Sequence, residues 1–186
     1  GVAECLYLLG RYSWSQKMLK QLLQEVVDNS YFSTIIKHRL ATAYLHEGNH
    51  DEALVWSTAA IQYFQHKFSG AFASRCLDMH ARILMHVNKL EDAKAYLDIS
   101  LSIKRALGDR LGLQKGLLAL SSINWELGLP HSEQAALEAL TLAQHSQDLV
   151  GQQFIHKYLS NILKKQPEKR SYHLAKVAEI KQLIKS

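Results

Sequence analysis

Apolar residues recur along the chain at the three- and four-residue spacing of amphipathic helices, and short polar turns interrupt them at regular intervals. The clearest example covers residues 40–53, where one apolar run ends at Gly48 and a second begins behind Asp51 and Glu52. Glycine suits the end of a helix because a left-handed backbone conformation carries no Cβ penalty there. Acidic residues favour the start of the next helix. The pattern predicts two antiparallel helices joined by a tight turn.

Small residues occupy the positions where these two helices would meet. Ala41 in the first helix and Ala53 in the second allow the helix axes to approach near the short end of the usual ~8 to 10 Å separation. The same layout of small residue, turn residue and small residue recurs in Ala81, Asn88 and Ala93, and again around Ser121 and Gly128. The chain therefore contains an internal repeat.

Turns fall at residues 10, 48, 88, 128 and 167, which is a spacing of 38 to 40 residues. Glycine-containing corners at 68–70, 110–112 and 149–151 separate the hairpins, and Pro130 is expected in the first turn of a helix. The spacing predicts an all-α protein of about five antiparallel α-hairpins. We expect residues 1–186 to form one helical repeat domain, and a fragment of a longer protein, because the first hairpin keeps only about half of its first helix.

A basic helix at about 171–185 is expected to cap the array. Its apolar residues would cover the open end of the fifth repeat while its lysines stay in water. These apolar residues are Leu174, Val177, Ile180, Leu183 and Ile184.

The charge is unevenly distributed along the chain. The formal net charge is +5, but residues 157–186 alone hold eight Lys or Arg and two Asp or Glu, so the rest of the chain is close to neutral. A basic last helix is a weaker indication of nucleic-acid binding than a basic domain is. Nucleic acid is therefore disfavoured as a partner, and a solvated terminal helix is the simpler interpretation.

The composition disfavours membrane and secreted classes of protein. No stretch approaches the ~20 uninterrupted apolar residues of a membrane span. Cys5 and Cys76 both lie in apolar helical patterns, which predicts two buried thiols in a reducing compartment. We expect a cytoplasmic protein.

Residues 46–50 read His-Glu-Gly-Asn-His, which matches the H-E-x-x-H pattern of zinc proteases. That site requires one unbroken helix that places both imidazoles on one face. Because Gly48 and Asn49 occupy the predicted turn, the two histidines would leave different helices. We expect no zinc site here.

No other motif points to catalysis. No Gly-rich loop opens a helix after a strand, and the Gly-x-Ser-x-Gly pattern of hydrolases is missing from the sequence. The ten histidines show no consistent metal-ligand spacing. The sequence predicts a protein that is not an enzyme, with no cofactor and no metal.

The chain resembles the tetratricopeptide repeat family over essentially its whole length. The family's order of small residue, Tyr, Gly and Ala is matched by Ala41, Tyr44, Gly48 and Ala53. The period near 40 resembles the longer-repeat branch, as in bacterial peptide-pheromone receptors, large transcription activators and cell-polarity adaptors. The resemblance implies a right-handed superhelix of hairpins whose first helices line a concave groove.

The resemblance also implies which residues would face that groove. Carried over repeat by repeat, the family's groove positions mix several cations with a few aromatic and apolar side chains. An acidic or C-terminal peptide with apolar anchors would suit such a wall, and Arg82, Lys115 and Trp125 are expected to contribute most. The predicted groove residues are Tyr7, His38, Thr42, Arg75, Asp78, Arg82, Met85, Lys115, Ser122, Trp125, Lys157 and Asn161.

Three functions stay open from the sequence. The leading hypothesis is a non-enzymatic protein- or peptide-binding scaffold that uses the groove. The second is a sensory or regulatory domain of a bacterial signalling protein or transcription regulator. The third is nucleic-acid contact by the basic last helix. The fold alone does not identify the partner.

Overall fold

The structure is a computed structural model, and it describes residues 2–28, 30–64 and 70–185. All regular elements in these ranges are α-helices, and the chain divides into two compact units, residues 1–103 and 104–186. The helices are α1 (Val2–Leu8), α2 (Tyr12–Glu25), α3 (Tyr31–Glu47), α4 (His50–Gln62), α5 (Gly70–His86), α6 (Leu90–Leu107), α7 (Arg110–Glu126), α8 (Ser132–His145), α9 (Leu149–Ile162) and α10 (Pro167–Lys185). The predicted all-α repeat fold is confirmed.

Unit 1 contains α1 to α5 and most of α6. Helices that follow each other in the chain pack together from α1 to α5, and α3 also contacts α5. Ala41 and Ala53 are fully buried where α3 meets α4, and Leu40, Tyr44 and Ile83 complete this part of the core. The small residues therefore allow the close helix packing that the repeat pattern predicts.

The turn between α3 and α4 has the predicted conformation. Gly48 has a φ of 84°, and its N–H donates to the carbonyl oxygen of Leu45. The Asn49 side chain then accepts from the backbone N–H of Glu52 and caps α4. The H-E-x-x-H segment is thus divided between two helices, as expected. In the next hairpin, Asn88 adopts the same left-handed conformation as Gly48, with a φ of 58°.

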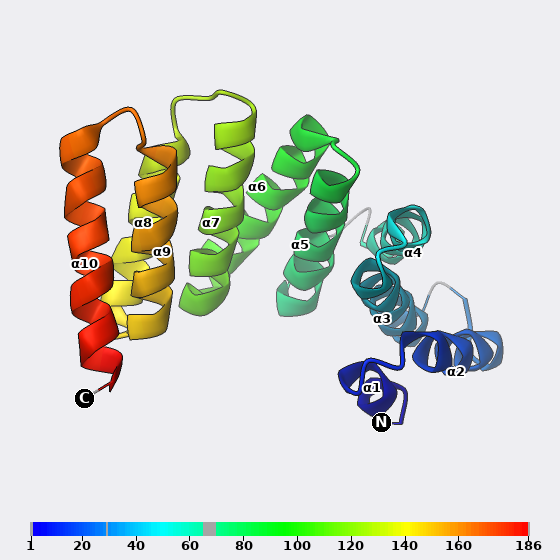
Figure 1. The fold of residues 1–186 in the computed structure, drawn as a ribbon. Helices are drawn as coiled ribbons and strands as arrows, with labels where there is room; N and C mark the ends of the chain where they lie inside the picture. Colours follow the sequence, from blue (N-terminus) through cyan, green and yellow to red (C-terminus); the bar gives the residue numbers. More distant parts are fainter. Residues whose placement is uncertain (1, 29, 65–69, 186) are drawn as a thin grey trace. The chain divides into compact units, whose positions relative to one another are not determined.

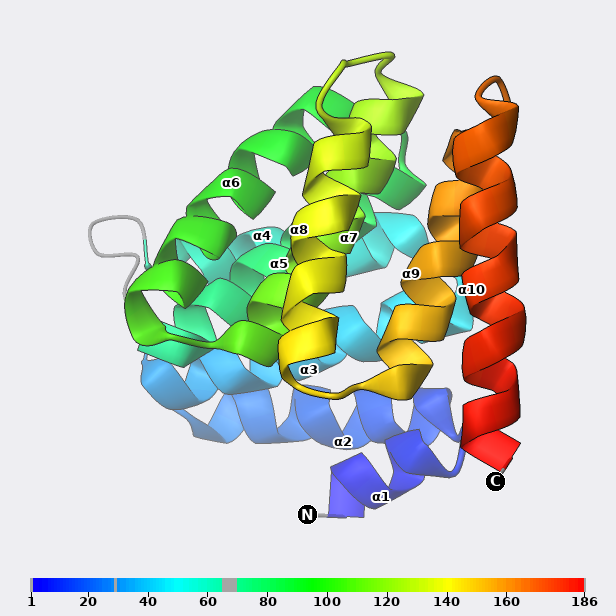
Figure 2. The same ribbon diagram turned by 90° about the vertical axis from the view of Figure 1, so that its left-hand side faces the viewer.

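Unit 2 contains the end of α6 and α7 to α10. Figures 1 and 2 show α7 beside α8 and α9 beside α10, and α8 also packs on α9. Ser121 of α7 is fully buried and donates to the carbonyl oxygen of Ser132, while the Ser132 hydroxyl donates back to the carbonyl oxygen of Ser121. This reciprocal pair fixes the crossing of α7 and α8.

Each unit buries a histidine in its core. In unit 1, the Nδ1 atom of His80 lies 2.9 Å from the hydroxyl of Ser57 on α4. In unit 2, the Nδ1 atom of His156 on α9 lies 2.7 Å from the Nδ1 atom of His173 on α10. All four side chains are buried. The His156–His173 contact joins the last two helices.

The first helices of unit 2 begin differently from the sequence prediction. Residues 110–112 and 149–151 were expected to form corners between hairpins, but they are the first turns of α7 and α9. The side chain of Asp109 accepts from the N–H of Gly112, and that of Asp148 accepts from the N–H of Gly151. These aspartates are N-caps, so each helix starts at the first residue of the predicted corner. Of the corner at 68–70, Phe68 and Ser69 lie outside the described residues.

A Cβ atom at Gly112 or Gly151 would collide with the carboxylate of the preceding cap. The glycine therefore leaves room for the aspartate side chain to bend back onto the backbone N–H. Pro130 was placed in the first turn of a helix, but α8 begins later, at Ser132.

Three further expectations are corrected. Cys5 is exposed on α1, while Cys76 is buried and its burial raises the pKa of the thiol to about 12. The last helix begins at Pro167 rather than near residue 171, because a proline is well accommodated at the first helical position.

The face of α10 that packs on the rest of unit 2 also differs from the predicted one. His173 and Ile180 are buried, but Leu174, Leu183 and Ile184 are about half exposed. The buried stripe is thus shifted by one residue around the helix, because His173 takes the position facing α9 that Leu174 was expected to fill.

None of the helices in the described ranges is both long enough and apolar enough to cross a membrane.

Candidate functional site

The first-helix side of unit 1 is hollowed into a recess of about 390 Å³. Helices α1, α3 and α5 supply most of its walls, and α2 closes one end. We call it the unit 1 recess; its volume lies in the ~300 to 1,000 Å³ range of ligand sites. It is lined by Ala3, Glu4, Tyr7, Leu8, Ser15, Leu19, Tyr31, Ile35, His38, Arg39, Thr42, Phe72, Arg75 and Met79.

Helical periodicity explains why these residues meet. Side chains three, four or seven residues apart lie on one face of a helix. The α3 wall is one such stripe, and so is the α5 wall. The stripes are Tyr31, Ile35, His38 and Thr42 on α3, and Phe72, Arg75 and Met79 on α5.

Two guanidinium groups in the recess have different partners. Arg39 forms an ion pair with Glu4 of α1, at 3.1 Å between Nη1 and Oε1. Arg75 lies over the ring of Phe72, at 5.6 Å from the ring centroid. Among the described residues Arg75 has no carboxylate within ion-pair distance, so its charge is available to a ligand.

His38 lies on the α3 wall, and its pKa reflects burial and the positive charges around the recess. Its ring meets the ring of Phe72 edge-on at 5.6 Å. Burial, together with the smaller effects of the Arg75, Arg39 and Arg82 charges, lowers the pKa of His38 to about 4. The imidazole is therefore neutral at pH 7, and three cations act on the same point.

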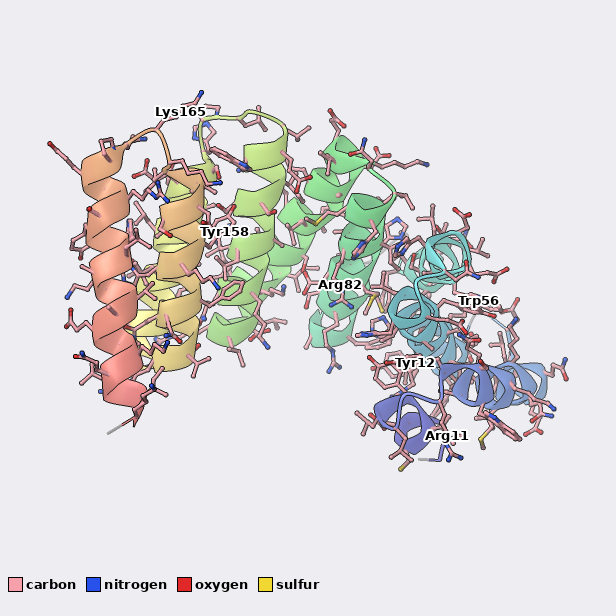
Figure 3. The ribbon with its side chains drawn as sticks, in the orientation of Figure 1. Arg11, Tyr12, Trp56, Arg82, Tyr158 and Lys165 are labelled. Atoms are coloured by element: carbon pink, nitrogen blue, oxygen red, sulfur yellow. The ribbon has the colours of Figure 1, made fainter. Side chains whose placement is uncertain are left out.

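Tyr7 closes the α1 side of the recess. Its ring packs against those of Tyr12 and His46, with centroids 5.6 and 5.3 Å away, and Figure 3 labels Tyr12 at the start of α2. Burial is the main reason why the pKa of Tyr7 is raised. Ser15 of α2 also donates to the carbonyl oxygen of Ala3 at 2.8 Å, which fastens α1.

The structure places four of the predicted groove residues of unit 1 in the recess and three elsewhere. Tyr7, His38, Thr42 and Arg75 line it. Asp78, Arg82 and Met85 do not. The Asp78 carboxylate accepts from the hydroxyl of Ser100 at 2.6 Å, Arg82 donates to the sulfur of Met79, and Met85 is half-buried near the end of α5. Arg82 extends from α5 in Figure 3.

Arg39, Tyr31, Phe72 and Met79 line the recess but were not predicted. Periodicity could have found them, because each shares a helical stripe with a predicted residue; Arg39, for example, lies three residues before Thr42. The pairing of Arg39 with Glu4 could not be found in this way, because Glu4 lies on another helix.

In unit 2, the first helices α7 and α9 present an exposed face that mixes lysines with aromatic residues. Trp125 is 52% exposed and Phe154 is 60% exposed. We call the following residues the α7–α9 face: Leu111, Lys115, Ser122 and Trp125 of α7, and Val150, Phe154, Lys157, Asn161 and Lys164, from α9 and the residues just after it. All the groove residues predicted for this part of the chain belong to it.

Two contacts hold α7 and α9 side by side. The hydroxyls of Tyr158 and Ser121 are 3.1 Å apart, and Figure 3 shows Tyr158 extending from α9. Gln114 donates to the carboxylate of Asp148 at 3.1 Å. The three lysines of the face, Lys115, Lys157 and Lys164, form no ion pair within the described part of the chain.

Metal chemistry has no visible basis in these surfaces. Across the described residues, no three His, Cys, Asp or Glu side chains converge in a way that could hold a metal ion. The recess and the α7–α9 face instead offer cations, aromatic rings and hydroxyl groups.

The comparisons with known proteins address the fold. No family model matches the sequence, and no curated protein matches it. Solved structures do match. A putative kinesin light chain with nearly identical TPR-like repeats from Podosopora anserina covers 100% of this chain and 94% of its own, with a TM-score of 0.87 and 13% identity. The chain has a tetratricopeptide-repeat-like fold.

Two other structures with this TPR-like fold are similar over 99% of the chain. BtubC (BKLC) from P. vanneervenii has a TM-score of 0.88 at 16% identity, with 78% of its own chain covered. A signal transduction ATPase with a tetratricopeptide repeat sensor from Pyrococcus horikoshii has a TM-score of 0.84 at 20% identity, with 29% of its own chain covered. The resemblance to the TPR family seen in the sequence is confirmed at the level of the fold.

Proposed function

We propose that this chain is a non-enzymatic, cytoplasmic scaffold that binds a protein or peptide on the exposed side of its first helices. TPR-like folds commonly mediate protein–protein interaction. The observation that carries the proposal is the unit 1 recess, where Arg75 has an aromatic ring beneath it and no carboxylate partner among the described residues.

The recess is suited to an acidic peptide segment with an apolar anchor. A ligand carboxylate would form a charge-assisted hydrogen bond with Arg75. Its apolar neighbour would contact Phe72, Met79 and Ile35, which give the recess its apolar lining. A C-terminal carboxylate and an acidic side chain offer the same chemistry to Arg75.

The α7–α9 face offers the same combination in an open form. Lys115 and Lys157 would attract carboxylates, and Trp125 would supply an apolar contact. Because this face is open rather than hollowed, a ligand there stays in water, and each lysine is expected to contribute less than an arginine in a recess.

A regulatory role is the second candidate. One of the similar structures is a signal transduction ATPase with a tetratricopeptide repeat sensor. A sensor domain would use the same binding surfaces, so the two candidates differ in what the bound peptide controls. The nucleic-acid alternative is weaker, because Lys169 and Lys176 of the basic helix pair with Glu133 and Glu179.

The experiment measures binding of three fluorescent pentapeptides to the intact chain. Each is amidated at its C-terminus, which removes the terminal carboxylate, and has two phenylalanines that flank a central residue, which is aspartate, asparagine or lysine. The aspartate peptide should bind best. Arg75→Glu should weaken its binding by more than about tenfold, since a charge-assisted hydrogen bond is replaced by a repulsion.

Lys89→Glu is the matched control, because it makes the same charge change at an exposed turn outside the recess. It should change the affinity by less than about twofold, with screening by salt. Equal binding of the three peptides, or unchanged binding to the Arg75→Glu variant, would contradict the acidic-peptide proposal.

A further inference from the structure

The unit 1 recess contains a carboxylate of its own. Glu4 lines it from α1 and holds Arg39 at 3.1 Å, and both side chains are almost half exposed. Hydrogen bonding and the charge of Arg39 are the main reasons why the pKa of Glu4 is lowered, so the group is ionised at neutral pH. A bound anion would therefore meet a fixed negative charge.

The two arginines of the recess are consequently not equivalent. Arg39 is neutralised by Glu4, while Arg75 has only the ring of Phe72 against it. One full positive charge is open to a ligand. A second becomes available only when Glu4 releases Arg39.

We propose that Glu4 sets the anion selectivity of the recess, so that it accepts a single carboxylate and discriminates against a phosphate dianion. This inference rests on the proposed binding of acidic peptides at the same site. It names a residue that acts by repulsion rather than by attraction, which is a common source of specificity.

The physical basis is the different charge of the two ligand groups. A carboxylate carries one negative charge, and Arg75 can neutralise it. A phosphorylated serine carries about −1.5 to −2 at pH 7 and has three acceptor oxygens. Its binding would need both arginines, and its repulsion by Glu4 is up to about twice as large, because the Coulomb energy scales with charge.

The position of α1 makes this repulsion persistent. Ser15 donates to the carbonyl oxygen of Ala3, and Tyr7 packs between the rings of Tyr12 and His46. Residues on both sides of Glu4 are thus held by α2 and α3. The α1 backbone at Glu4 therefore cannot move away from the recess without breaking contacts that are independent of the ion pair.

The test uses the aspartate pentapeptide, the asparagine pentapeptide and a third with phosphoserine at the centre. Glu4→Gln keeps the size of the side chain and removes its charge. We expect the affinity to rise by about threefold for the aspartate peptide and by up to about ninefold for the phosphoserine peptide, because doubling the repulsion energy squares the fold-change. Glu25→Gln, at the exposed end of α2, is the matched control and should leave the ratio of the two affinities unchanged.

Arg39→Gln is the second variant and should act in the opposite direction. It leaves the Glu4 charge without Arg39, so the preference for aspartate over phosphoserine should increase. The position of α1 is checked with a fluorophore on the exposed Cys5, since the other thiol, Cys76, is buried. Unchanged anisotropy of this label would show that Glu4→Gln acts through charge.

The outcomes separate this inference from the proposed function. The wild type could prefer aspartate over asparagine while Glu4→Gln leaves the ratio of the phosphoserine and aspartate affinities unchanged. This result would overturn the role of Glu4 but would be consistent with the acidic-peptide site. Equal binding of the aspartate and asparagine peptides to the wild type would overturn both. A selective gain for phosphoserine in Glu4→Gln, with Glu25→Gln unchanged, would establish the selectivity.

Discussion

Each unit buries a histidine on the first helix of a hairpin, but the partner of this histidine differs between the units. His80 of unit 1 faces a serine hydroxyl, whereas His156 of unit 2 faces a second imidazole. A hydroxyl can rotate and either donate or accept, so Ser57 satisfies either tautomer of His80. Two Nδ1 atoms at 2.7 Å require that one carries a proton and the other does not. The tautomers of His156 and His173 are therefore coupled, and a proton on both would break the contact.

The largest expected effect is a loss of stability in acid, which both units should show. Burial lowers the pKa of His80 and of His156 from about 6.5 to about 4, and burial also lowers the pKa of His173. The unfolded chain then binds more protons than the folded one below pH 6.5. The contribution of these histidines to the free energy of unfolding is fully present above pH 6.5 and is lost as the pH falls toward 4. For His156 alone the loss is about 3 kcal/mol.

Both units contain histidines of this kind. Burial also lowers the pKa of His38 to about 4 and lowers that of His86, so the described part of unit 1 holds three, whereas unit 2 holds the contacting pair. The charges that act on the pair are nearly balanced: Lys176 and Glu179 act on His156, and Glu133 and Lys169 act on His173. Hydrogen-exchange protection factors should therefore decrease toward pH 4 in α9 and α10 as well as in α3 to α5.

His173→Asn sharpens this comparison, because its amide offers a hydrogen-bonding atom near the position of Nδ1 and does not titrate. It should reduce the acid loss of unit 2 and leave that of unit 1 unchanged. An acid loss of unit 2 that is the same in His173→Asn and in the wild type would contradict the coupling argument.

Ser57→Ala should have an intermediate effect. It leaves Nδ1 of His80 buried without its partner, which costs about 1 to 3 kcal/mol in the free energy of unfolding. Urea unfolding at pH 7.5 measures it. Ser74→Ala is a suitable control, because this buried hydroxyl donates only to the carbonyl oxygen of Ala71 within its own helix. An equal cost for both variants would show that the Ser57–His80 contact adds nothing.

The smallest expected effect concerns the helix caps of the two units. Asn49→Ala and Asp148→Ala each remove an N-cap, at a cost of about 1 kcal/mol. The cost should be larger for Asp148, whose carboxylate also accepts from Gln114. Hydrogen bonds from Gly151 and Gln114 lower the pKa of Asp148, so its contribution is lost only in strong acid. Urea unfolding of both variants at pH 7.5 and pH 3 would test the difference, and a larger cost for Asn49→Ala at pH 7.5 would contradict it.

The sequence was sufficient to predict the hairpins, because their determinants are local. A left-handed residue such as Gly48 or Asn88 and a small residue such as Ala41 act within one hairpin. The starts of α7 and α9 escaped prediction because the first turn of each helix contains a glycine, Gly112 or Gly151, which was taken for part of a corner although it accommodates the capping aspartate. At α9 the residue before the cap, Gln147, has a φ of 55°, a conformation for which glutamine gives no sequence signal.

The candidate site was only partly predictable for a different reason. His38 and Arg75 follow from the repeat positions of α3 and α5. The neutralisation of Arg39 depends on a contact between α1 and α3, which are separated by more than 30 residues in the chain. Repeat phasing indicates which side chains face a surface, but it does not pair charges across helices.

The aspartate caps of unit 2 also bear on how such an array can grow. Asp109 and Asp148 lie 39 residues apart, and each is preceded by a residue with positive φ and followed at the third position by a glycine. The segment from Asp109 to Gln147 therefore starts with its own cap and stops directly before the next. A tandem duplication of this segment would insert one complete hairpin whose new junctions repeat an arrangement that the chain already contains.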